Sequence, residues 1–154
     1  MKLFFAGLLL ALTGCWEPKL DTPEALLQHY VYLSFSGVDA KELEQYFTPD
    51  FLQKLQEEQK EAVPNARQIS YKNLHLKKYT LLSKLCETEK VCQLRFEISY
   101  DEMSPSDKSI SFSTETKKIA VVKQTENKEW KLDEIDHLKT EHEIKKEIDV
   151  NPTK

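Results

Sequence analysis

Residues 92–100 read CQLRFEISY, and this stretch decides the fold class. Its apolar residues occupy every second position, namely Cys92, Leu94, Phe96, Ile98 and Tyr100. Because successive side chains of a β-strand point to opposite faces, strict alternation predicts a strand with one buried face. No other stretch of the chain gives so clear a strand signal, so the remaining elements are placed relative to it.

Further strand signals lie on both sides of this stretch. A run from Tyr79 to Leu85 precedes it, and residues 101–107 are predicted to form a loop after it. Alternating residues at 109–116 then lead into an apolar run at 119–122, and a turn at 126–128 returns the chain through residues 130–135. Residues 138–154 are rich in charge, and we expect either a last amphipathic helical turn or a frayed end.

Three helices are predicted ahead of the strands. The first begins at Pro23, capped by Asp21 or Thr22, and ends near Gly37. A short second helix follows Asp39, and a third runs from residue 49 to about residue 62. Helices followed by consecutive strands predict an α+β domain, with the helices on one face of a curved, mostly antiparallel sheet of four to six strands.

Two of the three cysteines, Cys86 and Cys92, lie between strand-like runs, whereas Cys15 lies in an N-terminal segment with the pattern of an export signal, described below. An even number of cysteines in an exported domain predicts a disulfide, here at the mouth of a hairpin. The alternative is a metal or redox pair. The five-residue gap is not a CxxC motif and no histidine lies beside either cysteine, so the disulfide is favoured.

The N-terminal segment has the pattern of an export signal. Lys2 precedes an apolar run at residues 3–12 that is too short to span a bilayer, which needs about 20 residues. The run ends in LTGC at residues 12–15, which resembles a bacterial lipobox. The resemblance implies that Cys15 is lipidated and becomes the mature N-terminus. Trp16 in place of an aspartate implies export to the outer membrane.

These signals divide the chain into four parts. We predict a signal peptide at 1–14, a lipidated tether at 15–22, a single α+β domain at 23–138 and a charged tail at 139–154. The formal net charge is −4, and only two of the 22 cationic residues are arginine, which argues against nucleic-acid binding. Three glycines cannot build a phosphate cradle, and His137 and His142 are five apart, so we expect no cofactor and no dedicated metal site.

Three segments carry a second resemblance. They are YVYL at 30–33 with SGVD at 36–39, YFTPD at 46–50 after Leu43, and WKL at 130–132. In this order they resemble the first helix, the Gly-Asp turn, the second helix and the closing strand of the nuclear transport factor two-like superfamily. That cone-shaped α+β fold is shared by ketosteroid isomerases and polyketide cyclases. The resemblance implies a cone whose interior can be either an open pocket or a filled core.

Aromatic residues are the candidates for lining such a pocket. They are Tyr30, Tyr46, Phe96, Tyr100 and Trp130. Tyr30 matches the isomerase tyrosine that stabilises the enolate oxygen. The place of the isomerase base, some two dozen residues downstream, is held by Lys54 and Leu55. No catalytic residue is therefore predicted, because a general base must reach the substrate proton.

The expected function follows from the anchor, the fold and the lack of a catalytic set. We expect a non-enzymatic lipoprotein of the bacterial cell envelope, anchored to the membrane through Cys15 at the periplasmic face of the outer membrane. It would bind a protein partner or a small apolar ligand. Two alternatives stay open: an isomerase- or cyclase-like enzyme with a pocket near Tyr30, and a homodimer that pairs exposed sheet faces.

Overall fold

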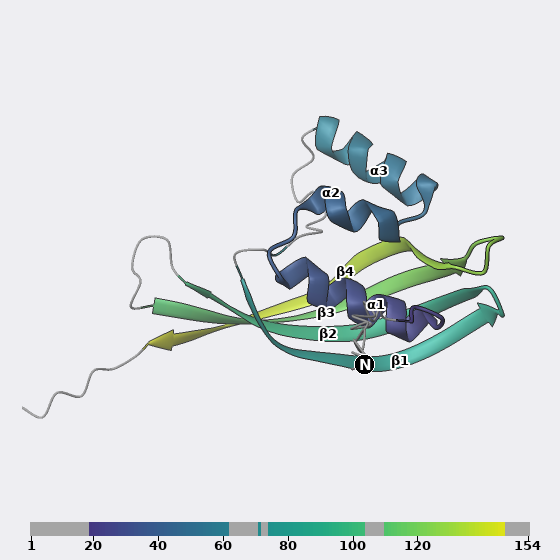
Figure 1. Ribbon diagram of the computed structural model, residues 1–154. Helices are drawn as coiled ribbons and strands as arrows, with labels where there is room; N and C mark the ends of the chain where they lie inside the picture. The colour runs from purple at the N-terminus through teal and green to yellow at the C-terminus, as the bar shows by residue number, and fades with distance from the viewer. Residues whose placement is uncertain (1–18, 62–70, 72–73, 104–109, 147–154) are drawn as a thin grey trace, which may run out of the picture.

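The computed structural model describes residues 19–61, 71, 74–103 and 110–146. The lipobox, including Cys15, and the first half of the predicted tether (residues 15–18) lie outside the described residues. Three α-helices pack on one face of a four-stranded antiparallel sheet, in the strand order β1-β2-β3-β4 (Figure 1). The predicted α+β class is confirmed, with four strands. No helix in the described part is long and apolar enough to cross a membrane.

The helices begin where the capping signals predicted. Helix α1 spans Pro23–Phe35, and the Thr22 hydroxyl accepts a hydrogen bond of 3.1 Å from the Ala25 amide. It ends before Gly37, whose φ of 93° is a left-handed conformation that glycine adopts without strain. Helix α2 (Ala40–Leu43) continues into a single 3-10 turn, η1 (Glu44–Tyr46).

Helix α3 (Pro49–Lys60) is tied to the sheet through its cap residue, Thr48. The Thr48 hydroxyl accepts from the Phe51 amide at 3.2 Å and donates to Asp133 at 2.8 Å. The Thr48 amide donates to the Leu132 carbonyl at 2.8 Å, beside an isolated parallel bridge between Phe47 and Leu132. One residue therefore both starts the helix and attaches it to the last strand.

Replacing Thr48 with alanine is expected to lower the free energy of unfolding by about 1–2 kcal/mol, since it removes a helix cap and a hydrogen bond to a carboxylate. Thr22→Ala is the matched control, because Thr22 caps α1 through a single bond at an exposed position. Its loss should be about 1 kcal/mol or less. Urea unfolding of both variants measures the difference, and equal losses would contradict the tie to the sheet.

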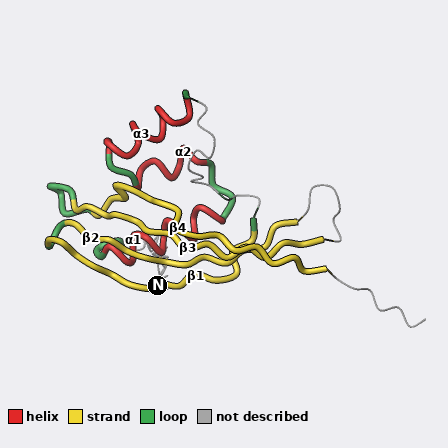
Figure 2. The backbone as a smooth tube through the Cα atoms, turned by 180° about the vertical axis from the view of Figure 1, so that it is seen from behind, coloured by secondary structure: helices red, strands yellow, loops and turns green. Residues whose placement is uncertain are grey.

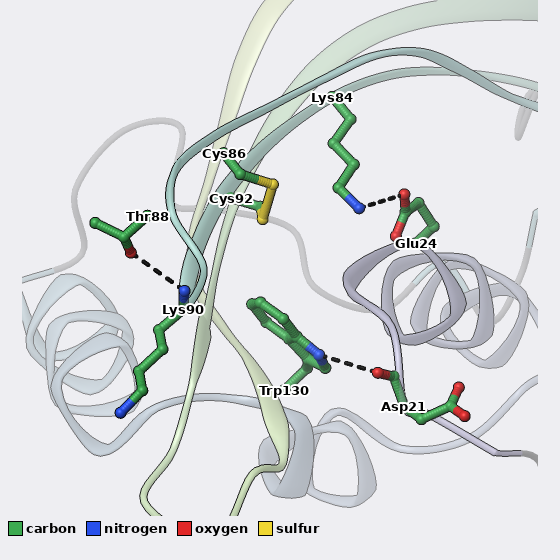
Figure 3. The surroundings of a disulfide bond; sticks show 8 residues. All are labelled: Asp21, Glu24, Lys84, Cys86, Thr88, Lys90, Cys92 and Trp130. Carbon is green, nitrogen blue, oxygen red and sulfur yellow. Dashed lines mark hydrogen bonds and ion pairs between the residues drawn. A yellow bond between two sulfur atoms is a disulfide. The ribbon is translucent and has the colours of Figure 1, made fainter.

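The sheet is a meander of four long strands. They are β1 (His75–Thr88), β2 (Val91–Met103), β3 (Ile110–Gln124) and β4 (Trp130–Lys146). Cys92 of β2 lies opposite Cys86 of β1 and Val122 of β3. Cys86 and Cys92 form the predicted disulfide at the β1–β2 hairpin (Figure 3). The disulfide is thus confirmed.

Two predicted boundaries were wrong. Residues 101–103 were assigned to a loop but continue β2, where Asp101 lies opposite Ser113. The segment from residue 138 was expected to be helical or frayed, but it is strand through Lys146. It pairs with the first half of β3 after a register shift that leaves Leu138 without a partner residue. The neighbouring strand supplies hydrogen-bond partners here, whatever the side chains are.

The hydrophobic core lies between the helices and the inner face of the sheet. Figures 1 and 2 show that the helices cover the half of the sheet nearest the β1–β2 and β3–β4 turns, while the opposite strand ends extend beyond the helical layer. Fully buried side chains from both layers meet in this half. They include Leu26, Leu27, Leu43, Phe51, Leu94, Phe96, Ala120, Val122 and Leu132.

The other face of the sheet is charged. Glu97 of β2 and Lys117 of β3 lie opposite each other and form an ion pair at 3.5 Å. Lys139 and Glu141 of β4 form another ion pair. Pairing two such faces would bury charged groups, which is costly unless every charge finds a partner. The homodimer through paired sheet faces stays a prediction. The charges on this face of the sheet disfavour it.

Candidate functional site

The interior behind α1 is closed. A cavity between α1 and the sheet is lined by Tyr30, Phe35, Tyr71, Phe96 and Lys118, among others, and holds only about 10 Å³. A cavity needs roughly that volume to hold one water molecule. Among the described residues the predicted pocket is therefore mostly filled core, and nothing as large as a steroid fits behind Tyr30.

The most unusual residue of this cavity is Lys118. It lies on the inner face of β3 with only 9% of its surface exposed. Its ammonium donates a short hydrogen bond to the Tyr71 hydroxyl, and its Nζ is 5.0 Å from the centre of that ring. None of the described residues that line the cavity is acidic. Burial disfavours the charged form and lowers the pKa of the Lys118 amine to about 8.

Tyr71 holds the Lys118 side chain in place. The tyrosine is 6% exposed, and its ring stacks on Phe35 at 4.5 Å with an angle of 5° between the planes. Its amide donates to the Ser34 carbonyl at 2.7 Å, which fastens it to the end of α1. Burial, with a smaller contribution from the nearby Tyr100, raises the pKa of the Tyr71 hydroxyl. Tyr71 is therefore a neutral hydroxyl beside a buried amine.

The five predicted pocket residues separate into two places. Tyr30 and Phe96 line the small cavity, and the Tyr100 ring packs next to it at 5.8 Å from the Tyr71 ring. Burial, and then the neighbouring Tyr71, raises the pKa of Tyr30. Tyr46 and Trp130 line a different hollow on the surface. The structure thus brings three of the five candidates to the cavity region.

This second hollow is a surface groove of about 840 Å³ next to the start of the described chain. Its apolar lining comes from Leu20, Leu26, Tyr46 and Trp130. The Trp130 indole donates to the Asp21 carbonyl at 3.2 Å, so the N-terminal approach to α1 is fastened across the beginning of β4 (Figure 3).

Polar residues complete the groove. His29 and Tyr46 share a hydrogen bond of 3.1 Å between Nε2 and the hydroxyl oxygen. Partial burial lowers the pKa of His29 and raises that of Tyr46, so both are neutral at pH 7. The charged lining residues carry both signs. They are Lys19, Lys128, Lys131, Asp21 and Glu129. The groove therefore combines an apolar floor with a rim that can pair with either charge.

The histidines of β4 do not form a metal site with their neighbours. His137 shares a short hydrogen bond with the Thr140 hydroxyl, and His142 Nδ1 lies 3.0 Å from the Thr114 hydroxyl. Within the described ranges no group of three or more potential ligands comes together. Burial, and then the charge of Lys118, lowers the pKa of His137.

The two positions that correspond to the isomerase base are occupied by a residue of a surface ion pair and by a core residue. Lys54 of α3 pairs with Glu134 at 3.0 Å on the surface, and Leu55 is buried in the core. Lys118 and Tyr71 are the polar residues that the sequence analysis missed. Lys118 continues the even-numbered inner face of β3, which runs through Thr114, Thr116, Ala120 and Val122, so strand alternation could have located it.

Comparisons with known proteins identify no family for this chain, so its architecture is the basis for classifying it. A scan against protein-family models finds no match, and a search of the curated proteins finds none with significant similarity. The structure itself gives an α+β class, with three helices on an open four-stranded antiparallel sheet. Because one fold of this kind hosts many activities, function has to be argued from the two hollows just described.

Proposed function

We propose that this chain is a lipid-anchored protein of the bacterial cell envelope whose α+β domain binds a protein partner without catalysing a reaction. The observation that carries the proposal is the contrast between the two hollows. The interior cavity holds about 10 Å³, whereas the groove beside the N-terminal approach holds about 840 Å³. Ligand sites are commonly 300–1,000 Å³, so of these two hollows among the described residues the groove is the one with the size to receive a partner.

The chemistry of the groove suits a polypeptide segment. Tyr46 and Trp130 offer large aromatic surfaces, the kind of residue that dominates protein interfaces. The mixed charges of the rim can pair with main-chain dipoles and with side chains of either sign. A purely apolar small molecule would make no use of these charged groups, so a segment that carries both apolar and polar groups suits the groove better.

The proposed anchor would hold the groove close to the membrane. Lys19 borders the groove and follows Cys15 by four residues, which span at most about 14 Å when extended. The partner is then a protein at or near the same membrane surface. The nuclear transport factor two-like resemblance supports the cone architecture and remains part of this proposal. The isomerase-like alternative gains no support, since none of the described residues that line the cavity next to Tyr30 is a carboxylate.

Photo-crosslinking in intact cells tests the groove. A photoreactive residue at Gln45, which lines the groove, should give a discrete crosslinked product with one protein partner. The same residue at Glu115, an exposed position of β3 away from the groove, is the matched control and should not. Adding Tyr46→Arg should abolish the Gln45 product. Equal products at both positions, or a product that survives Tyr46→Arg, would reject the groove as the binding site.

The anchor has its own test. Mass spectrometry of the mature protein should show an N-terminus at Cys15 that carries acyl chains. One acyl chain holds a protein only marginally, while two or more hold it stably. A mature N-terminus elsewhere, or an unmodified cysteine, would overturn the lipid anchor. The crosslinking result would still test partner binding at the groove.

A further inference from the structure

We propose that the polypeptide segment held in the groove carries a carboxylate beside an apolar side chain, and that Lys128 is the residue which selects for this carboxylate. The segment is the partner segment of the proposed function, on which this proposal rests. Two features of the groove support it, namely the sign of its unpaired charges and the backbone conformation of Lys128.

The acidic residues that line the groove are Asp21 and Glu129. Glu129 already has a cationic partner, because its carboxylate lies 3.6 Å from Lys131 Nζ. The same ammonium donates to the Gln45 carbonyl at 2.6 Å. Asp21 accepts from Trp130 through its carbonyl, and Figure 3 shows that its carboxylate points away from the indole. The acidic groups are therefore either paired or directed away from Trp130.

Two lysines of the groove keep an unpaired charge. Lys19 lies on the approach to α1 and Lys128 lies in the turn between β3 and β4, and both are exposed. Neither forms an ion pair with any described residue. The whole chain has a net charge of −4, so positive charge is not a general property of its surface. Complementary charge steers association and suppresses partners of the wrong sign, which favours an acidic segment over a basic one.

The His29–Tyr46 pair adds one neutral donor to the groove. If the imidazole N–H donates to Tyr46, the tyrosine hydroxyl keeps its proton for another acceptor. If the hydroxyl donates instead, the other ring nitrogen of His29 keeps its proton. Neither side chain hydrogen bonds to any other described residue. In both tautomers the pair can donate to an oxygen of a bound segment, next to the aromatic floor.

Lys128 has a backbone conformation that a lysine rarely adopts. Its φ is 64°, and it is the only non-glycine residue of the described chain with a positive φ. The Lys128 amide donates to the Thr125 carbonyl at 3.0 Å, and its carbonyl accepts from the Gln124 side chain at 3.2 Å. A residue with positive φ after such a turn is typically glycine. The turn uses only the backbone of Lys128, so the lysine side chain is left to serve the groove.

Lys128→Gly separates binding from folding. The midpoint of thermal unfolding should rise by about 2 °C, because glycine adopts this φ without strain. In intact cells, the crosslinked product of the photoreactive residue at Gln45 should fall about threefold, as for the loss of one partly exposed ion pair. A weaker product from a more stable protein cannot be a folding defect. An unchanged product in Lys128→Gly would overturn the role of Lys128.

Two further variants control for charge. Lys128→Arg keeps the charge and should keep the product. Lys78→Gln removes a charge from an exposed position of β1 that does not line the groove, and it should leave the product unchanged. Equal falls in Lys78→Gln and Lys128→Gly would show that only the overall charge matters, which would also overturn the proposal.

Mass spectrometry of the crosslinked product identifies the bound segment. The partner peptide joined to position 45 should contain an apolar side chain and, near the crosslink, an aspartate, a glutamate or a C-terminal carboxylate. Lys128→Glu should lower the product further than Lys128→Gly, because it brings two negative charges together. Where the partner's carboxylate is a side chain, replacing it with lysine should restore the product of Lys128→Glu.

Two negative results differ in what they reject. A partner peptide without a carboxylate near the crosslink would overturn the acidic segment and leave binding at the groove in place. The absence of any discrete product from the photoreactive residue at Gln45, in a protein that is folded, would reject the groove as a binding site and the acidic segment with it.

Discussion

Replacing Phe96 with alanine is expected to lower the free energy of unfolding by about 3–5 kcal/mol. Phe96 is only 1% exposed, lies at the centre of β2 and packs its ring 6.0 Å from that of Tyr79. It also forms one wall of the small cavity. Removing the ring takes away buried apolar contacts and leaves a larger void that a closed interior cannot fill by relaxation. Urea unfolding followed by circular dichroism measures the loss.

Tyr32→Ala is the matched control for this variant. Tyr32 of α1 is also aromatic and its ring is 6.4 Å from that of Tyr79, but it is 52% exposed. We expect a loss below about 1 kcal/mol, as for other surface substitutions. A loss at Phe96 no larger than that at Tyr32 would show that the interior is open to solvent, contrary to the closed core described above.

The free energy of unfolding is expected to rise by about 2 kcal/mol between pH 7.5 and pH 9.5. The cause is Lys118, whose pKa falls from its ordinary value of 10.5 to about 8 on burial. Below pH 8 the amine is charged in both states, and the folded state bears the full cost of burying the charge. As the pH rises, the folded protein releases this proton before the unfolded chain does, so folding becomes more favourable.

Two further features make this prediction specific. Above about pH 10 the trend should reverse, because burial raises the pKa of Tyr79 to about 12 and that of Tyr30 higher still. The unfolded chain then loses tyrosine protons first, which favours unfolding. Lys118→Met should remove the rise between pH 7.5 and 9.5 and leave the fall above pH 10. A rise that persists in Lys118→Met would mean that another group causes it.

The helices were the part of the fold that the sequence predicted best. Thr22-Pro23 and Thr48-Pro49 combine a capping hydroxyl with a proline that fits the first helical turn, and both start helices where predicted. These signals act over three or four residues, so they can be recognised in the sequence without knowledge of the tertiary structure. Alternation located the middle of the sheet for a similar reason, because one face of β2 is buried along most of its length.

The second half of β4 could not be predicted in this way. Thr140 and His142 occupy its inner positions and contact Thr116 and Thr114, so both faces of the strand are polar. A strand that buries little apolar surface gives no alternation of polarity. Its conformation depends on pairing with the first half of β3. That half lies far from it in sequence, on the other side of the β3–β4 turn, and the register of the hairpin brings the two together.

The candidate site was predicted only in part, for a related reason. Tyr30 and Phe96 were selected because aromatic residues commonly line pockets, and both border the cavity. Lys118 was passed over because a lysine usually marks an exposed position, although its place on the strand puts it on the buried face. Tyr71 lies outside the helices and strands of the described chain, so no periodic pattern of apolar residues around it predicts its burial.

The attachment of the helices to the last strand has a consequence for the order in which the protein assembles. The β-strands pair with their neighbours in sequence, so hairpins can form early and independently. The helical layer closes on β4 through contacts that join distant parts of the chain, such as Asp21 to Trp130, which are 109 residues apart. The N-terminal third is therefore synthesised first, but its tertiary contacts form last. A chain shortened before Trp130 would keep every helix signal and lose the strand on which the helices close.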